Sequence, residues 1–449
     1  MSNKIRVAEI LGALSHALDL TEGQPPGHCV RCCWIGVSIG RELGLPEEAL
    51  KDLYYALLLK DLGCSSNAAR ICSLYLADDL NFKKDFKLLN SSLPQVLRFA
   101  LSHTGPNADL AQRFRSIINI LQNGGQIARE LIETRCQRGA QIARQMHFSE
   151  AVAEAILDLD EHWDGGGKPL GRSGRDISMF ARVALLAQVV DVFHAASGRR
   201  AALAEIGHRS GGWFDPAVVG AFQKVAASDA FWQTLARDDL EEVVLTMEPG
   251  QEAMLADDDY LDDIAQAFAR VIDAKSPYTS GHSERVAIFT DLIAEEMGFT
   301  TSHRRWLKRA ALLHDIGKLG VSNSVLDKNG KLDDLEWVSM RRHAEMSEVI
   351  LSRIGAFADL SKIAGAHHER LDGKGYPRGL FAHQIDLDTR IISTADVFDA
   401  LTAERPYRAA MPISKAMAIM WEGAGTSHDP ICIEALERAL ANAEFAAAA

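Results

Sequence analysis

The sequence predicts an all-α protein built from two tandem helical bundles. Ala, Leu, Glu and Arg dominate most segments, and strand-like alternation of apolar and polar residues is scarce. The chain has 449 residues, which is too long for one ordinary hydrophobic core. Its two halves also repeat four sequence blocks in the same order. Together these observations predict two related helical domains.

A break in the helical pattern separates the halves. The stretch TMEPGQEAMLADDDYLDD contains Pro249 and Gly250 and is typical of a linker. We therefore expect one domain at residues 1–250 and a second at residues 257–449.

The repeat is visible as matched blocks. GHCVRCCWIGVSIGRELG parallels GHSERVAIFTDLIAEEMG, and ALLLKDLGC parallels AALLHDIGK, both at an offset of 254 residues. DEHWDGGGKPLG parallels HERLDGKGYPRG at 208, and VVDVFHA parallels TADVFDA at 205. The fall in offset from 254 to 208 places about 46 extra residues in the first copy, between Asp61 and Arg135.

Composition excludes several classes of partner. The formal net charge of −13 disfavours DNA and an anionic membrane surface as partners. The N-terminus lacks the apolar run of a signal peptide, and no membrane span is expected. The seven cysteines are then expected to be reduced thiols in a cytoplasmic protein.

The second half gathers polar residues on apolar helix faces. Leu307, Ala310, Ala311 and His314 share one face, so His314 should point into the core, and Asp315 follows it. A buried imidazole and carboxylate are costly unless they are satisfied. One explanation is a structural His–Asp pair at a helix end; the other is a metal site. Five further candidates lie on or beside apolar stripes, namely His282, His343, His367, His368 and Asp396. Imidazoles and carboxylates in this number suit divalent transition metals.

These residues carry a family resemblance. His282, His314-Asp315 and Asp396 resemble the H…HD…D pattern of HD-domain phosphohydrolases, and HHERLDGKGYP resembles the signature of the HD-GYP subfamily. The resemblance covers residues 260–440 and implies an all-helical phosphodiesterase that hydrolyses cyclic dinucleotides, chiefly cyclic di-GMP. It implies a site with iron or manganese.

The resemblance also assigns roles. It implies seven metal ligands, which are His282, His314, Asp315, His343, His367, His368 and Asp396. Family members with three metals have a glutamate where this chain has Tyr278, so we expect two divalent ions per chain, bridged by a catalytic Asp315.

Other residues are expected to act on the substrate or on a loop. Lys318 should neutralise a phosphate oxygen during catalysis, and Arg405, Arg408 and Tyr376 are expected at the substrate. The remaining signature residues are expected to support the ligands or fix the loop, and these are Glu369, Asp372, Gly373, Gly375 and Pro377.

The first half departs from the ligand pattern. Counterparts of five metal-site positions are Lys60, Arg135, Leu159, Asp160 and Cys64, whereas His28, Asp61 and Asp191 are expected to remain. Lys60 could replace a cation among Asp61, Asp160 and Asp191. We expect a degenerate copy that serves as scaffold, sensor or homodimer surface.

The leading functional hypothesis is a metal-dependent cyclic di-GMP phosphodiesterase. Two alternatives stay open: the same chemistry on 3′,3′-cyclic GMP–AMP (3′,3′-cGAMP), or a catalytically weak cyclic-dinucleotide receptor. The intact ligand set and Lys318 favour an enzyme over a receptor.

Overall fold

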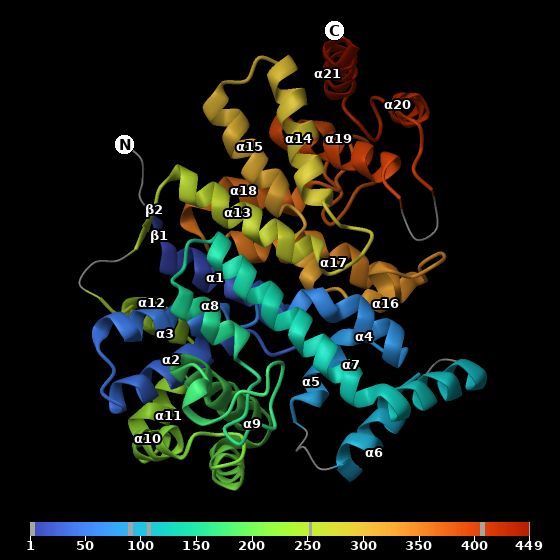
Figure 1. Ribbon diagram of the computed structural model, residues 1–449. Helices are drawn as coiled ribbons and strands as arrows, with labels where there is room; N and C mark the ends of the chain where they lie inside the picture. Colours follow the sequence, from blue (N-terminus) through green and yellow to red (C-terminus); the bar gives the residue numbers. More distant parts are fainter. Residues whose placement is uncertain (1–4, 89–92, 106–108, 251–253, 405–408, 449) are drawn as a thin grey trace. The chain divides into compact units, whose positions relative to one another are not determined.

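The computed structural model describes residues 5–88, 93–105, 109–250, 254–404 and 409–448. Contacts divide the chain into two compact units, Met1–Tyr260 and Leu261–Ala449. The strands among the described residues are β1 (Ile5–Arg6) and β2 (Leu255–Ala256), which form one short antiparallel pair. Everything else that is regular is helical, so the all-α prediction is confirmed (Figure 1).

The first unit is a bundle around α2, which packs on α3 and α9. Its helices are α1 (Val7–Thr21), α2 (His28–Glu42), α3 (Glu47–Leu59), η1 (Cys64–Asn67), α4 (Ala68–Tyr75), α5 (Asp79–Phe86), α6 (Leu93–His103), α7 (Leu110–Gln145), α8 (Glu150–Leu157), η2 (Gly174–Asp176), α9 (Met179–His208), α10 (Pro216–Ala226), α11 (Asp229–Leu235) and α12 (Leu240–Thr246).

The second unit repeats this plan around α14, which packs on α15 and α19. Its helices are α13 (Asp258–Asp273), α14 (His282–Glu296), α15 (Thr301–Leu313), η3 (Ile316–Gly320), α16 (Asn323–Leu326), α17 (Asp334–Leu351), η4 (Gly355–Phe357), α18 (Ala358–Ala366), η5 (Ala382–Gln384), α19 (Leu387–Thr402), α20 (Ile413–Glu422) and α21 (Pro430–Ala448).

Local signals in the sequence fix where the site-bearing helices begin. Asp333 and Glu336 form a reciprocal capping box at the start of α17, with N–H···O distances of 2.9 and 2.7 Å. Thr300 caps α15 and Asp386 caps α19 through side-chain oxygens. These caps fix the starts of three helices that lie next to or carry predicted ligands.

A tight contact between helices recurs in both units. A Cβ added to Gly317 would lie 2.0 Å from the carbonyl oxygen of His343, and one on Gly63 would lie 1.9 Å from that of Arg135. Only glycine allows this approach, which brings η3 against α17 and η1 against α7. The role of Gly317 is thus to make room for a neighbouring helix.

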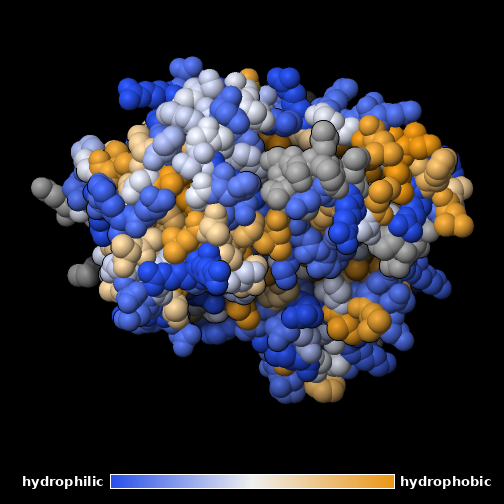
Figure 2. Space-filling view, turned by 90° about the horizontal axis from the view of Figure 1, so that it is seen from below, coloured by the Kyte–Doolittle hydropathy of each residue, from blue (hydrophilic) through white to orange (hydrophobic). Residues whose placement is uncertain are grey.

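The extra residues of the first copy form α5, α6 and the first half of α7. They pack with α4 and the rest of α7 over a small apolar cluster made of Ile71, Phe82, Phe99, Ile127 and Leu131. The first half of α7 keeps an exposed apolar stripe that includes Leu110, Phe114 and Leu121. Such patches interrupt a largely hydrophilic surface on the face drawn in Figure 2.

Helix α9 is long and apolar enough to span a membrane by length and composition alone. Most of its apolar window is buried inside the first unit, as in the central helix of a bundle. Its burial against α2 accounts for its composition.

Candidate metal centre

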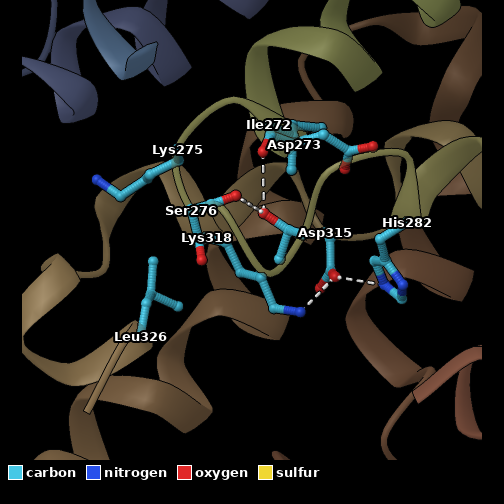
Figure 3. A pocket seen from close by; sticks show the side chains of 9 residues that line it. Ile272, Asp273, Lys275, Ser276, His282, Asp315, Lys318 and Leu326 are labelled. Carbon is cyan, nitrogen blue, oxygen red and sulfur yellow. Dashed lines mark hydrogen bonds and ion pairs between the residues drawn. The ribbon is translucent and has the colours of Figure 1, made fainter. Parts of the chain in front are cut away.

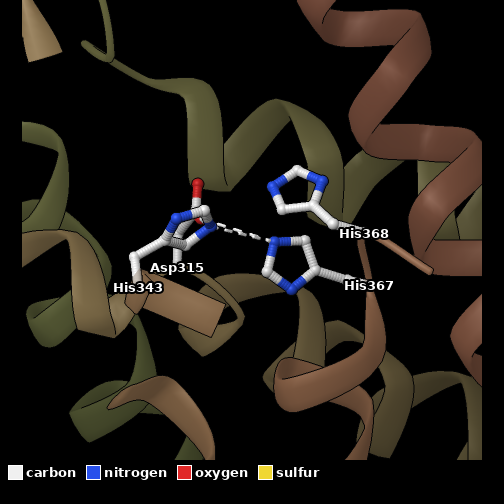
Figure 4. A group of neighbouring side chains, drawn as sticks. All are labelled: Asp315, His343, His367 and His368. Atoms are coloured by element: carbon white, nitrogen blue, oxygen red, sulfur yellow. Dashed lines mark hydrogen bonds and ion pairs between the residues drawn. The ribbon is translucent and has the colours of Figure 1, made fainter. Parts of the chain in front are cut away.

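Five helical segments of the second unit bring the seven predicted ligands together. His282 begins α14, His314 and Asp315 follow α15, His343 lies in α17, His367 and His368 follow α18, and Asp396 lies in α19. Each of the seven belongs to a group whose ligand atoms lie within 4.8 Å of one another. All are buried except His368, which is partly exposed. Figure 4 shows four of them, Asp315, His343, His367 and His368, gathered at one point.

Asp315 divides the cluster into two halves. Its Oδ2 lies 3.4 Å from His282 Nε2 and 3.3 Å from His314 Nε2. Its Oδ1 lies 3.4 Å from His343 Nε2 and 3.6 Å from His367 Nε2. Donors at this separation fit around an ion whose bonds are about 2.0–2.2 Å long. One carboxylate thus faces two donor sets, one with each oxygen.

Three histidines are held in the tautomer that a metal requires. The Nδ1 atoms of His314, His343 and His367 donate to carbonyl oxygens three residues earlier, at 2.6, 2.5 and 2.7 Å. The Nε2 atoms therefore carry lone pairs directed at the centre. His343 Nε2 and His367 Nε2 face each other at 3.4 Å, which is unfavourable unless a cation lies near both.

Buried polar atoms without hydrogen-bond partners also indicate a site for a cation. His282 Nε2, His314 Nε2 and Asp315 Oδ1 are buried and lack a hydrogen-bond partner among the described residues. Leaving such atoms unpaired is costly, and metal coordination would satisfy all three. The residues therefore fit a divalent metal centre.

The pKa values of His282 and His343 are shifted in opposite directions, because carboxylates surround His282. Burial disfavours the imidazolium of His282, but the nearby carboxylates of Asp315, Asp396 and Asp399 outweigh it and raise its pKa to about 10. On the other side burial lowers the pKa of His343 to about 3. The carboxylates draw positive charge to the centre, and His343 stays neutral as a ligand must.

Sequence reasoning missed the residue that orients His282. Asp399 accepts from His282 Nδ1 at 2.7 Å and from Arg285 Nε at 2.5 Å. In the first unit Asp191 accepts from His28 Nδ1 and Arg31 Nε, both at 2.6 Å. Asp191 is therefore the counterpart of Asp399 and not of the predicted ligand Asp396. The pairing of VVDVFHA with TADVFDA at an offset of 205 was wrong, because the offset stays at 208 through this helix.

With that correction, Gln188 stands where the second unit has Asp396. The first unit keeps only His28 and Asp61 of the seven ligand positions. Lys60 Nζ fills its centre, where it pairs with Asp61, lies 3.0 Å from His28 Nε2 and lies 3.3 Å from Gln188 Oε1. Its ammonium takes the place expected for a cation, though with different neighbours from those predicted.

The two other acids expected around Lys60 have partners elsewhere. Asp160 pairs with Arg135, the counterpart of His343. Asp191 is held by Arg31 and His28. The prediction that Asp160 and Asp191 surround Lys60 was therefore wrong, since both carboxylates are already neutralised.

A small pocket lies beside the centre (Figure 3). Lys318, Ser276, Thr279 and Leu326 line it, and Asp315 and His282 form its inner wall. Lys318 Nζ lies 2.5 Å from Asp315 Oδ2 and is half-buried. Its ammonium is placed to meet an anionic ligand that enters this pocket.

The signature loop is fixed by its own acids. Glu369 is buried and accepts backbone N–H groups of Arg378 and Leu380 at 2.7 and 2.8 Å. Asp372 accepts the N–H of Lys374 at 3.1 Å. Glu161 and Asp164 make the equivalent bonds in the first unit. These acids therefore hold the loop in both copies.

The other loop residues also have defined places. Gly373 has a φ of 74°, and a Cβ on Gly375 would lie 2.4 Å from Glu369 Cα. Pro377 follows Tyr376, whose ring packs on His368 at 4.8 Å between centroids. Arg405 and Arg408 lie outside the described residues.

The comparison with known families agrees with this architecture. The HD domain family matches residues 87–218 and 266–431, one segment in each unit. This chain belongs to the HD-domain family. The predicted resemblance and the prediction of two HD domains are confirmed.

Individual relatives extend the match. The 3′3′-cGAMP-specific phosphodiesterase 3 of Vibrio cholerae is 53% identical over 98% of this chain and 95% of its own length. The cyclic di-GMP phosphodiesterase response regulator RpfG of Xanthomonas campestris is 40% identical over 39% of this chain and 47% of its own length. A crystal structure of a V. cholerae cyclic GMP–AMP specific phosphodiesterase (V-cGAP3) matches with a TM-score of 0.68 and 49% identity, covering 98% of both chains.

Proposed function

We propose that the protein is a metal-dependent cyclic dinucleotide phosphodiesterase whose reaction takes place in the second unit. The observation that carries this proposal is the convergence of six predicted ligand side chains around a seventh, Asp315, with three buried donor and acceptor atoms left without hydrogen bonds among the described residues. Of the two substrates expected from the sequence, we place 3′,3′-cGAMP first. The relative that spans nearly the whole chain is specific for it, whereas the cyclic di-GMP phosphodiesterase of X. campestris matches less than half of the chain.

The ligands would hold two divalent ions of the iron or manganese type. His282, His314 and Asp396 would serve one side of Asp315, and His343, His367 and His368 the other. Bound there, such ions would polarise the phosphodiester and lower the pKa of water so that it attacks phosphorus.

The chain's own residues prepare this chemistry. Asp315 presents one oxygen to each donor set, and three backbone carbonyls fix the imidazole tautomers. Lys318 can leave Asp315 for a non-bridging phosphate oxygen and stabilise charge that grows as the P–O bond breaks. His368 is partly exposed, whereas the other six predicted ligands are buried.

Turnover on a substrate panel tests the proposal. The iron- or manganese-loaded protein should hydrolyse 3′,3′-cGAMP faster than cyclic di-GMP, and chromatography with mass spectrometry should identify linear products. Metal-loaded protein that binds a cyclic dinucleotide without cleaving it would instead be a receptor.

The metal content is expected to be two ions per chain. Lys60 fills the centre of the first unit, and of the seven ligand positions only His28 and Asp61 keep their residue type there, so that unit should stay free of metal. Elemental analysis of protein loaded with manganese and then desalted measures this number. A value of four would show that the first unit binds metal in spite of Lys60.

Asp399 is expected to tune the metal affinity. Replacing it by asparagine removes the charge that fixes His282 Nδ1–H and should weaken metal binding by about 10- to 100-fold. Asp191→Asn is the matched control, because it breaks the same contact in the unit without the full ligand set. A metal titration in which both variants behave alike would contradict this role for Asp399.

A further inference from the structure

The duplication separates parts that build the fold from parts that serve the reaction. The clamp of histidine, aspartate and arginine and the loop acids occur in both units. They therefore belong to the fold. A feature that the second unit has and the first has lost is a candidate for chemistry. Beyond the ligands, one such feature is a tier of side chains formed by Trp337, Arg341 and Tyr376.

This tier leads outward from the metal centre. The ring of Tyr376 lies 4.8 Å from that of His368 and 6.4 Å from that of His343, measured between centroids. The guanidinium carbon of Arg341 lies 5.5 Å from the ring centroids of both Tyr376 and Trp337. Trp337 and Arg341 are one helical turn apart on α17, so their side chains share a face.

Neither Trp337 nor Arg341 is needed to fill the core. Trp337 is 43% exposed, and Arg341 is exposed and pairs with no carboxylate among the residues that the structure describes. At the offset of 208, the first unit has Arg129 in place of Trp337, Glu133 in place of Arg341 and Lys168 in place of Tyr376. None of these three positions carries an aromatic ring in the first unit, so this tier belongs to the second unit and has no counterpart in the first.

We propose that this tier binds a guanine base of the substrate, an inference that rests on the proposed function. Exposed aromatic rings stack nucleobases, and an arginine fork donates to two acceptors at once. Guanine offers O6 and N7 as two acceptors, whereas adenine places an amino group at the corresponding position. Under the proposed function Lys318 and the metal centre would meet the phosphate, so the base is the part left for Arg341.

The test uses Arg341→Met in the full-length protein, with Arg342→Met as the matched control. Arg342 is also exposed and lies on the same helix, but its guanidinium does not stack on either ring of the tier. The substrates are 3′,3′-cGAMP, cyclic di-GMP, cyclic di-AMP and the base-free diester bis(p-nitrophenyl) phosphate. Cyclic di-AMP is followed as a substrate or as a competitive inhibitor.

We expect Arg341→Met to lower kcat/KM for both guanine-containing substrates by about 10- to 100-fold, mainly through KM. Trp337→Ala should have an effect of similar size through lost stacking, about 10- to 100-fold. Cyclic di-AMP, the base-free diester and the metal content should change little in Arg341→Met.

Two results would overturn the inference. Equal losses on cyclic di-AMP would mean that Arg341 contacts phosphate and not guanine, and a loss on the base-free diester would mean that it supports the metal centre. If the unaltered protein cleaves no cyclic dinucleotide, the proposed function itself is at fault. That outcome is distinct because it is seen with the unaltered protein alone.

Discussion

Replacing Asp315 by alanine is expected to lower phosphodiesterase activity by about 1,000-fold or more, since metal-ion stabilisation of the transition state contributes several kcal/mol. Both oxygens of Asp315 face histidines at 3.3–3.6 Å, so its loss opens both donor sets at once. The variant should also retain less than the two ions expected of the unaltered protein. Activity per folded protein and elemental analysis measure the two effects together.

Lys318→Ala provides the contrast for this result. Lys318 pairs with Asp315 but contributes no ligand atom to the cluster, so metal should remain bound while turnover falls by about 100- to 1,000-fold. A Lys318→Ala protein that cleaves at the normal rate would remove the role assigned to it. An Asp315→Ala protein that keeps two ions and full activity would remove the bridging role of Asp315.

Replacing Asp61 by alanine is expected to destabilise the first unit by about 3–5 kcal/mol, the usual effect of removing one partner of a buried ion pair. Lys60 and Asp61 are both fully buried in the first unit. Burial alone would favour the neutral lysine, but the Asp61 carboxylate raises the pKa of Lys60 well above its usual value. Without Asp61, only His28 and Gln188 remain as hydrogen-bond partners of the buried ammonium among the described residues.

A double substitution distinguishes lost pairing from lost packing. Lys60→Met combined with Asp61→Leu removes both charges and keeps most of the volume, so it should recover most of the stability lost in Asp61→Ala. Because the chain has two units, hydrogen exchange at the amides of α2 and α3 reports the effect more directly than a single melting temperature.

The activity of Asp61→Ala carries separate information. Turnover per folded molecule should stay within a few-fold of normal, because Asp61 pairs with a lysine in place of a metal. If Asp61→Ala is as inactive as Asp315→Ala while its fold is intact, the first unit is part of the catalytic machinery. The description of the first unit as a scaffold would then fail.

Much of the candidate site was predictable because helical spacing and repetition are local properties of a chain. His314 lies on the apolar face of its helix, and the repeated blocks by themselves revealed the duplication and the extra residues of the first copy. The seven ligand candidates follow from the same spacing together with the signature motif. None of these features depends on which helices touch.

The tertiary structure decided the contacts between distant residues. Asp396 and Asp399 are three residues apart on one helix, so periodicity alone cannot tell which lies among the predicted ligands and which orients His282. The choice depends on how α14 packs on α19, and that packing also showed that Asp191 matches Asp399.

The same limit applies to the two centres as a whole. Sequence indicated that Lys60 replaces a ligand, but only packing showed that Gln188 and His28 surround it while Asp160 pairs with Arg135. The position of a side chain in the helical repeat determines which face of its helix it occupies. Its partners come from helices far away in the chain, and their identity is set by how closely packed side chains and backbone meet in three dimensions.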